Sequence, residues 1–63
     1  MNNALVKFCE SKGVINLQYV SEDKAREYYS GFCPAINKKI SVMYAYFQFG
    51  TVWFDGVISG MAR

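Results

Sequence analysis

The longest apolar segment of the chain runs from residue 40 to residue 58 and dominates the expected fold. It is rich in β-branched and aromatic side chains and has Gly50 near its middle, which is typical of two strands joined by a tight turn. We therefore predict a β-hairpin over this segment.

A two-residue loop at Phe49-Gly50 would place Tyr46 opposite Trp53 and would give the hairpin two unlike faces, because side chains alternate along a strand. The expected core face is wholly apolar and consists of Met43, Ala45, Phe47, Val52, Phe54 and Ile58. The other face combines aromatic rings with one carboxylate and consists of Val42, Tyr44, Tyr46, Trp53, Asp55 and Val57. Phe-Gly is not the preferred turn pair, so a longer loop with a bulge is the alternative, and a slip of one residue would change this assignment.

Two shorter segments precede the hairpin. Residues 14–20 alternate between apolar and polar side chains, which predicts a strand with one covered and one wet face. The apolar positions of this strand are Ile15, Leu17 and Tyr19. Residues 3–13 follow a helical spacing after Asn3, which is a suitable capping residue, and predict a short helix. A strand over residues 4–10 is the competing interpretation.

A second helix is predicted over residues 21–31. Ser21 can cap its first turn, and the acidic residues that follow suit the positive end of the helix dipole. Its apolar positions recur every three to four residues and form one stripe of Ala25, Tyr28, Tyr29 and Phe32. Gly31 and Pro34 would end this helix and leave residues 33–39 as the loop back to the sheet.

These elements predict a single small α+β domain over residues 1–63. The expected architecture is a small antiparallel sheet of three strands with one or two short helices packed on one face, in the order αβαββ. If the amino-terminal segment is a strand, the order becomes ββαββ.

Composition limits the ways in which so short a chain can be stabilised. The 63 residues are 52% apolar and 17% aromatic, which is too hydrophobic for a disordered chain. A core of this size rarely supplies more than ~3–5 kcal/mol, so such domains often need a disulfide, a metal or a partner. With no His and two cysteines, Cys9 and Cys33, one chain cannot build the usual four-ligand zinc site. Nothing in the sequence is typical of a disulfide-bonded secreted protein, so we expect self-association or a partner.

We expect a cytoplasmic protein that is not an enzyme and binds no cofactor or metal. The amino end lacks the basic start and long apolar run of a signal peptide, and Asp55 disfavours a membrane-spanning helix over residues 40–61. No His is available for proton transfer near neutral pH, and the chain has no glycine-rich phosphate loop. Cys9 lies on the apolar side of the predicted helix and is expected to be buried and inert.

The candidate functional residues are the aromatic side chains of the second hairpin face and the charges beside them. Asp55 is expected to be exposed or bonded to a tyrosine hydroxyl rather than to act as a base. The predicted partner-binding set is Tyr44, Tyr46, Trp53, Asp55, Lys38 and Lys39. Tyrosine and tryptophan are enriched at protein interfaces, and an exposed face of this kind usually contacts a partner or a second copy of the chain.

Single-stranded nucleic acid is the alternative partner. Tyrosine and tryptophan rings can stack on unpaired bases while Lys38 and Lys39 contact phosphates. Against this interpretation, the net charge is only +2 and Asp55 lies on the same predicted face.

A short domain with no catalytic set is similar in kind to the accessory proteins that phages encode. That similarity implies a stoichiometric inhibitor or modulator that binds a host enzyme, such as a polymerase, a nuclease or a CRISPR effector. The expected function is therefore surface occlusion of a larger protein, with homodimerisation as a further expectation.

Overall fold

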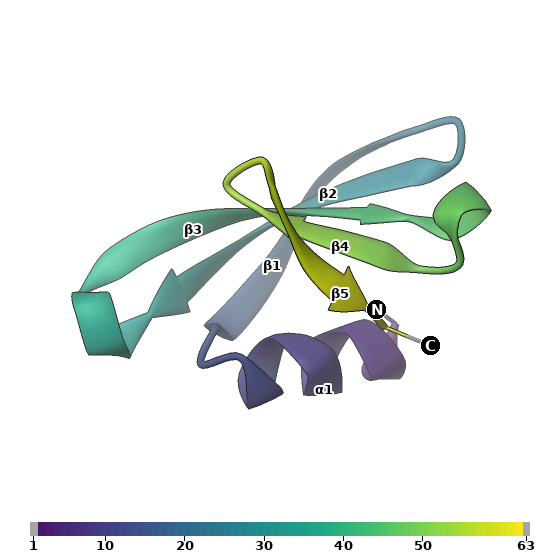
Figure 1. Ribbon diagram of the computed structural model, residues 1–63. Coiled ribbons are helices and arrows are strands. Elements are labelled where there is room, and N and C mark those ends of the chain that lie inside the picture. Colours follow the sequence, from purple (N-terminus) through teal and green to yellow (C-terminus); the bar gives the residue numbers. More distant parts are fainter. Residues whose placement is uncertain (1, 63) are drawn as a thin grey trace.

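The computed structural model describes residues 2–62, which form one α-helix and one antiparallel sheet of five strands in sequence order (Figure 1). The helix is α1 (Asn3–Ser11). The strands are β1 (Ile15–Asp23), β2 (Arg26–Cys33), β3 (Lys38–Ala45), β4 (Thr51–Phe54) and β5 (Val57–Met61). Short 3-10 turns at Pro34–Ile36 and Tyr46–Gln48 follow β2 and β3. The prediction of a three-stranded sheet with one or two helices is therefore wrong.

The amino-terminal helix is confirmed. Asn2, rather than Asn3, caps it, because the Asn2 Oδ1 atom accepts hydrogen bonds from the backbone N–H groups of Ala4 and Leu5, at 2.9 and 3.3 Å. Leu5 and Cys9 lie one turn apart and are fully buried. The helix thus presents one apolar stripe to the sheet.

The strand expected over residues 14–20 is also confirmed, but it is longer and less regular than predicted. Asn16 has a φ of 55°, and the pairing of β1 with β2 shifts register twice. These irregularities interrupt the alternation, so Leu17 packs against the core while Ile15 and Tyr19 are 38% and 50% exposed.

The helix predicted over residues 21–31 is wrong, because this segment contains the turn between β1 and β2. Asp23 pairs with Arg26, and Lys24 takes the left-handed conformation with a φ of 44°. The segment after this turn also alternates, with Tyr29 and Gly31 buried between less buried neighbours. Aromatic side chains favour strands, and pairing along the whole of β3 outweighs the weaker helical stripe.

The β3–β4 hairpin is confirmed, but its register differs from the prediction. Met43, not Tyr46, pairs with Trp53, and Ala45 pairs with Thr51. The connection is therefore the five-residue loop 46–50, which contains a 3-10 turn followed by left-handed Phe49 and Gly50, with φ of 58° and 78°. A Cβ atom on Gly50 would lie 2.3 Å from the carbonyl oxygen of Ala62, so this loop requires glycine there.

A second tight turn follows β4 and creates the strand that the sequence analysis missed. Asp55 and Gly56 both have positive φ, 50° and 84°, and join the paired residues Phe54 and Val57. Asp-Gly is a preferred pair for a two-residue hairpin turn. β5 begins directly after it.

The core lies between α1 and one face of the sheet. Its buried members are Leu5, Cys9, Val14, Tyr29, Ile40, Val42, Tyr44, Val52 and Ala62. Phe8 of α1 reaches Phe54, with ring centroids 6.3 Å apart, and closes over Gly60 of β5. Figure 1 shows α1 below the sheet and no α-helix of residues 2–62 above it. The sheet therefore has one covered face and one open face.

Candidate binding surfaces

The open face of the sheet carries a row of large side chains that crosses four neighbouring strands. Tyr28 of β2 pairs with Met43 of β3, Met43 with Trp53 of β4, and Trp53 with Ile58 of β5. Directly paired residues of antiparallel strands project to the same face. We call Tyr28, Met43, Trp53 and Ile58 the open-face row.

A hollow of about 300 Å³ lies beside this row. Its lining includes three members of the row together with Ser30 and Ser41, which pair with each other on β2 and β3. Because serine is small, this pair leaves space next to the larger Tyr28, Met43 and Trp53. Val20 of β1, which is 60% exposed, and Gly56 of the β4–β5 turn also line the hollow.

The described residues that line this hollow carry no formal charge. The polar side chains of its lining are Ser30, Ser41, Tyr28, Tyr29 and the indole of Trp53. Arg26, further along the same face of β2, lies over the Phe47 ring, 5.3 Å from its centroid. The hollow is thus a largely apolar depression with a few hydroxyl-bearing side chains in its lining, which suits an uncharged apolar group.

The predicted aromatic set is not brought together on one face. Tyr44 belongs to the core, with only 7% of its surface exposed, and its hydroxyl donates a long 3.5 Å hydrogen bond to the Ala62 carbonyl. Tyr46 lies in the loop after β3 and is 46% exposed. Trp53 alone of these three lies on the open face. The observed pairing of β3 with β4 differs from the predicted pairing by three residues. A shift by an odd number of residues turns the side chains of one strand to the other face of the sheet, so Tyr44 and Trp53 lie on opposite faces.

Asp55 has a structural part in the β4–β5 turn. Its Oδ1 atom accepts a hydrogen bond of 2.8 Å from the Ser41 backbone N–H, and its own N–H donates to the Ser41 carbonyl at 2.7 Å. Lys38 lies 3.8 Å from the other carboxylate oxygen, but both side chains are exposed, so this pair contributes little to stability. Asp55 therefore fastens the turn to β3, and no tyrosine hydroxyl bonds to it within residues 2–62.

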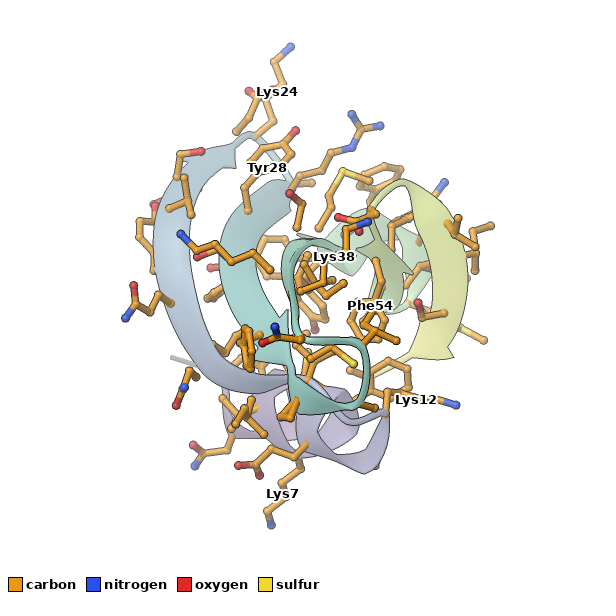
Figure 2. The ribbon with its side chains drawn as sticks, turned by 90° about the vertical axis from the view of Figure 1, so that its left-hand side faces the viewer. Lys7, Lys12, Lys24, Tyr28, Lys38 and Phe54 are labelled. Atoms are coloured by element: carbon orange, nitrogen blue, oxygen red, sulfur yellow. The ribbon has the colours of Figure 1, made fainter. Side chains whose placement is uncertain are left out.

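The lysines are dispersed over the molecule. Lys38 and Lys39 are exposed at the start of β3, where Lys38 is paired with Asp55 and Lys39 projects to the same face as Ser41. Figure 2 shows Lys24 and Lys7 at opposite ends of the molecule, with Lys38 between them. The described residues thus show no basic stripe along the open face.

Two tyrosines and one carboxylate, Tyr29, Tyr46 and Glu27, form a cluster at the edge of the core that the sequence analysis missed. Glu27 of β2 accepts a hydrogen bond of 2.9 Å from the Tyr29 hydroxyl, and the same carboxylate acts on the hydroxyl of Tyr46. The interaction with Glu27, followed by loss of hydration, raises the pKa of Tyr46 to about 12. Burial, together with the same carboxylate, raises the pKa of Tyr29 above its usual range. The signal in the sequence is Glu27 and Tyr29 at strand spacing, which a helical interpretation conceals.

The Cys9 thiol is not an activated nucleophile. Cys9 is fully buried, as predicted, and burial followed by the neighbouring Glu10 raises its pKa to about 11. A raised pKa is the reverse of what a reactive cysteine needs. Cys9 and Cys33 are both free thiols, and residues 2–62 contain no cluster of three or more potential metal ligands of the His, Cys, Asp and Glu types.

No helix within residues 2–62 has the length and apolar character needed to cross a membrane. Comparison of the chain with protein-family models, with curated proteins and with solved structures finds no match.

Proposed function

We propose that this chain is a non-catalytic protein-binding module that contacts its partner through the open face of the sheet. The observation that carries the proposal is the open-face row beside its uncharged hollow, on the side of the sheet opposite α1. Aromatic and methionine side chains are enriched at protein interfaces, and hot spots cluster where an anchor can fill a pocket. The proposed partner is a protein that inserts an uncharged apolar side chain into the hollow.

The proposed mode of action is surface occlusion. The module would act stoichiometrically, as an inhibitor or modulator that covers a site on a larger protein. The raised pKa values of Cys9 and Tyr46 support a non-catalytic role, because a nucleophile or general base at neutral pH requires the opposite shift.

Charge favours protein over nucleic acid as the partner. Binding to phosphates depends on several cations acting together, whereas Lys7, Lys24 and Lys38 lie far apart (Figure 2) and Lys38 is paired with Asp55. An apolar interface would respond weakly to salt, and nucleic-acid binding would weaken steeply as salt is added.

The test is site-specific photocrosslinking in the native source. A photoreactive phenylalanine analogue replaces Tyr28 in the open-face row, and a matched variant carries it at Lys7, which is exposed on α1. We expect one discrete protein adduct from position 28 and none from position 7, with a yield that 0.5 M salt leaves unchanged. Adducts of equal yield at both positions, or an adduct to nucleic acid, would overturn the proposal.

Trp53→Ala provides the quantitative check once the crosslinked partner is purified. Loss of an interface tryptophan costs more than about 1 kcal/mol, or roughly a fivefold loss of affinity. Lys7→Ala, on the exposed side of α1, is the control and should leave the affinity unchanged. A larger loss from Lys7→Ala than from Trp53→Ala would contradict the proposed surface. If the adduct is a second copy of this chain, light scattering must show a dimer.

A further inference from the structure

A second hollow lies on the open face, next to the one beside the open-face row. It measures about 330 Å³ and is lined by Asn16, Gln18, Ser30, Gly31, Phe32 and Lys39. The two hollows are neighbours, because Ser30 lines both of them. Their chemistry differs, since polar side chains predominate in the second hollow and its lining includes the cation of Lys39.

Strand pairing places these polar side chains on one face of the sheet. Gln18 of β1 pairs with Ser30 of β2, and Phe32 of β2 pairs with Lys39 of β3. Directly paired residues of antiparallel strands project to the same side, as do residues two positions apart on one strand. The bulge near the start of β1 adds Asn16 to the same hollow. Amide, hydroxyl and ammonium groups therefore surround one depression.

The polar side chains of this lining have no polar partner within residues 2–62. None of them takes part in a side-chain hydrogen bond of the described chain. The ion pair within these residues is Lys38–Asp55, which leaves Lys39 without a carboxylate, and Asp55 lines neither hollow. Amide, hydroxyl and ammonium groups can all donate hydrogen bonds to a carboxylate, and bonds to a charged acceptor are the stronger kind.

The separation of the two hollows matches the repeat of an extended peptide. Ser41 lines the first hollow and Lys39 lines the second, and they are two residues apart on the same face of β3. Two residues of a strand span about 7 Å. In an extended partner segment, side chains two positions apart also project to one side with that separation. One such side chain can enter the uncharged hollow while the other reaches Lys39.

We infer that the open face binds an extended acidic segment of its partner, in which an apolar side chain and a carboxylate are two positions apart. The apolar side chain occupies the hollow beside Trp53. The carboxylate accepts hydrogen bonds from Lys39 and from the amides of Asn16 and Gln18. A basic side chain in its place would be repelled by the lysine, so charge sets the specificity. This inference rests on the proposed function, because it names the partner chemistry of the same surface.

The first experiment titrates the protein with short peptides, blocked at both ends, and follows the Trp53 indole and Lys39 amide signals by NMR. Each peptide contains leucine and, two positions away, aspartate, asparagine or lysine, and each is made with the two side chains in both orders. In one of these orders, we expect saturable shifts with the aspartate peptide and at least threefold weaker binding of the asparagine peptide at low ionic strength. Equal affinity for these two peptides, or no saturable shift, would overturn the inference.

Lys39→Glu tests the residue through a gain of binding. This variant should prefer the lysine peptide to the aspartate peptide, because the charge of the second hollow is reversed while the first hollow is unchanged. Lys7→Glu, at an exposed position of α1, changes the net charge equally and should keep the preference of the parent. An unchanged preference in Lys39→Glu, or the same reversal in Lys7→Glu, would refute the assignment.

The asparagine peptide also separates failure of this inference from failure of the proposed function. If it binds as tightly as the aspartate peptide, and Trp53→Ala abolishes the binding of both, the open face remains a binding surface and only the acidic requirement fails. If no peptide binds and position 28 gives no specific photocrosslinked adduct, the proposed function fails as well.

Discussion

Replacement of Val42 and of Met43, one at a time, by alanine tests which face of β3 is covered. Val42 is 2% exposed and belongs to the core, whereas Met43 is partly exposed in the open-face row. The register expected from the sequence had assigned these two neighbours the opposite way, with Met43 in the core. The pair therefore separates the two registers directly.

The expected magnitudes follow from burial. Val42→Ala removes two methyl groups from a closed core, which costs about 1.6 kcal/mol at ~0.8 kcal/mol per group, and the cavity left behind increases the loss to roughly 2–3 kcal/mol. Met43→Ala removes a side chain that is already partly in water, and it should cost about 1 kcal/mol or less. For a domain of this size, the total stability is only roughly 3–9 kcal/mol.

Urea unfolding followed by Trp53 fluorescence measures both variants, and thermal unfolding provides a second estimate. At about 4–8 °C per kcal/mol, Val42→Ala should lower the Tm by roughly 10–20 °C and Met43→Ala by less than about 8 °C. If Met43→Ala destabilises the protein as much as Val42→Ala does, the assignment of the two faces is wrong.

Two further perturbations test the loop and the tyrosine cluster. Gly50→Ala should lower the free energy of unfolding in urea by roughly 2–4 kcal/mol, because the added Cβ atom would meet the Ala62 carbonyl oxygen. Gly56→Ala is the control, since Gly56 has a similar φ and open space around it, and it should cost only about 1 kcal/mol. Equal losses in the two variants would contradict the close approach at Gly50. The raised pKa values of Tyr29 and Tyr46 mean that the folded state holds their protons more tightly than the unfolded state does. Their contribution to stability should be complete below pH 10 and should decline as the pH rises from 10 toward 12. A Tm of the parent protein that stays constant over that interval would refute this coupling.

The local elements with a single dominant signal could be predicted from the sequence. The amino-terminal helix has a capping asparagine and one apolar stripe, and the β3–β4 segment has a continuous run of β-forming side chains. The segment after Ser21 carries two signals, a helical stripe and an alternation, and local preference cannot decide between them. Pairing with β3 decides in favour of the strand, and that contact is not local in the sequence.

The candidate site depended on one turn, which explains why it was only partly predicted. Placing the turn at Phe49-Gly50 made Tyr44 and Trp53 neighbours on one face, whereas the five-residue loop puts them on opposite faces. Asp55 was interpreted as a strand residue although Asp-Gly is a strong hairpin signal. Trp53 as a partly exposed aromatic on an uncovered face was correctly anticipated, but its neighbours Tyr28 and Met43 were not.

The pairing of Met43 with Trp53 underlies the open face, the hollow beside it and the proposed binding function. A NOESY spectrum of the protein tests it most directly through contacts from the Trp53 indole ring. We predict cross-peaks from that ring to the Met43 and Ile58 methyl groups. Cross-peaks from the indole to the Tyr46 ring, with none to Met43, would contradict the account.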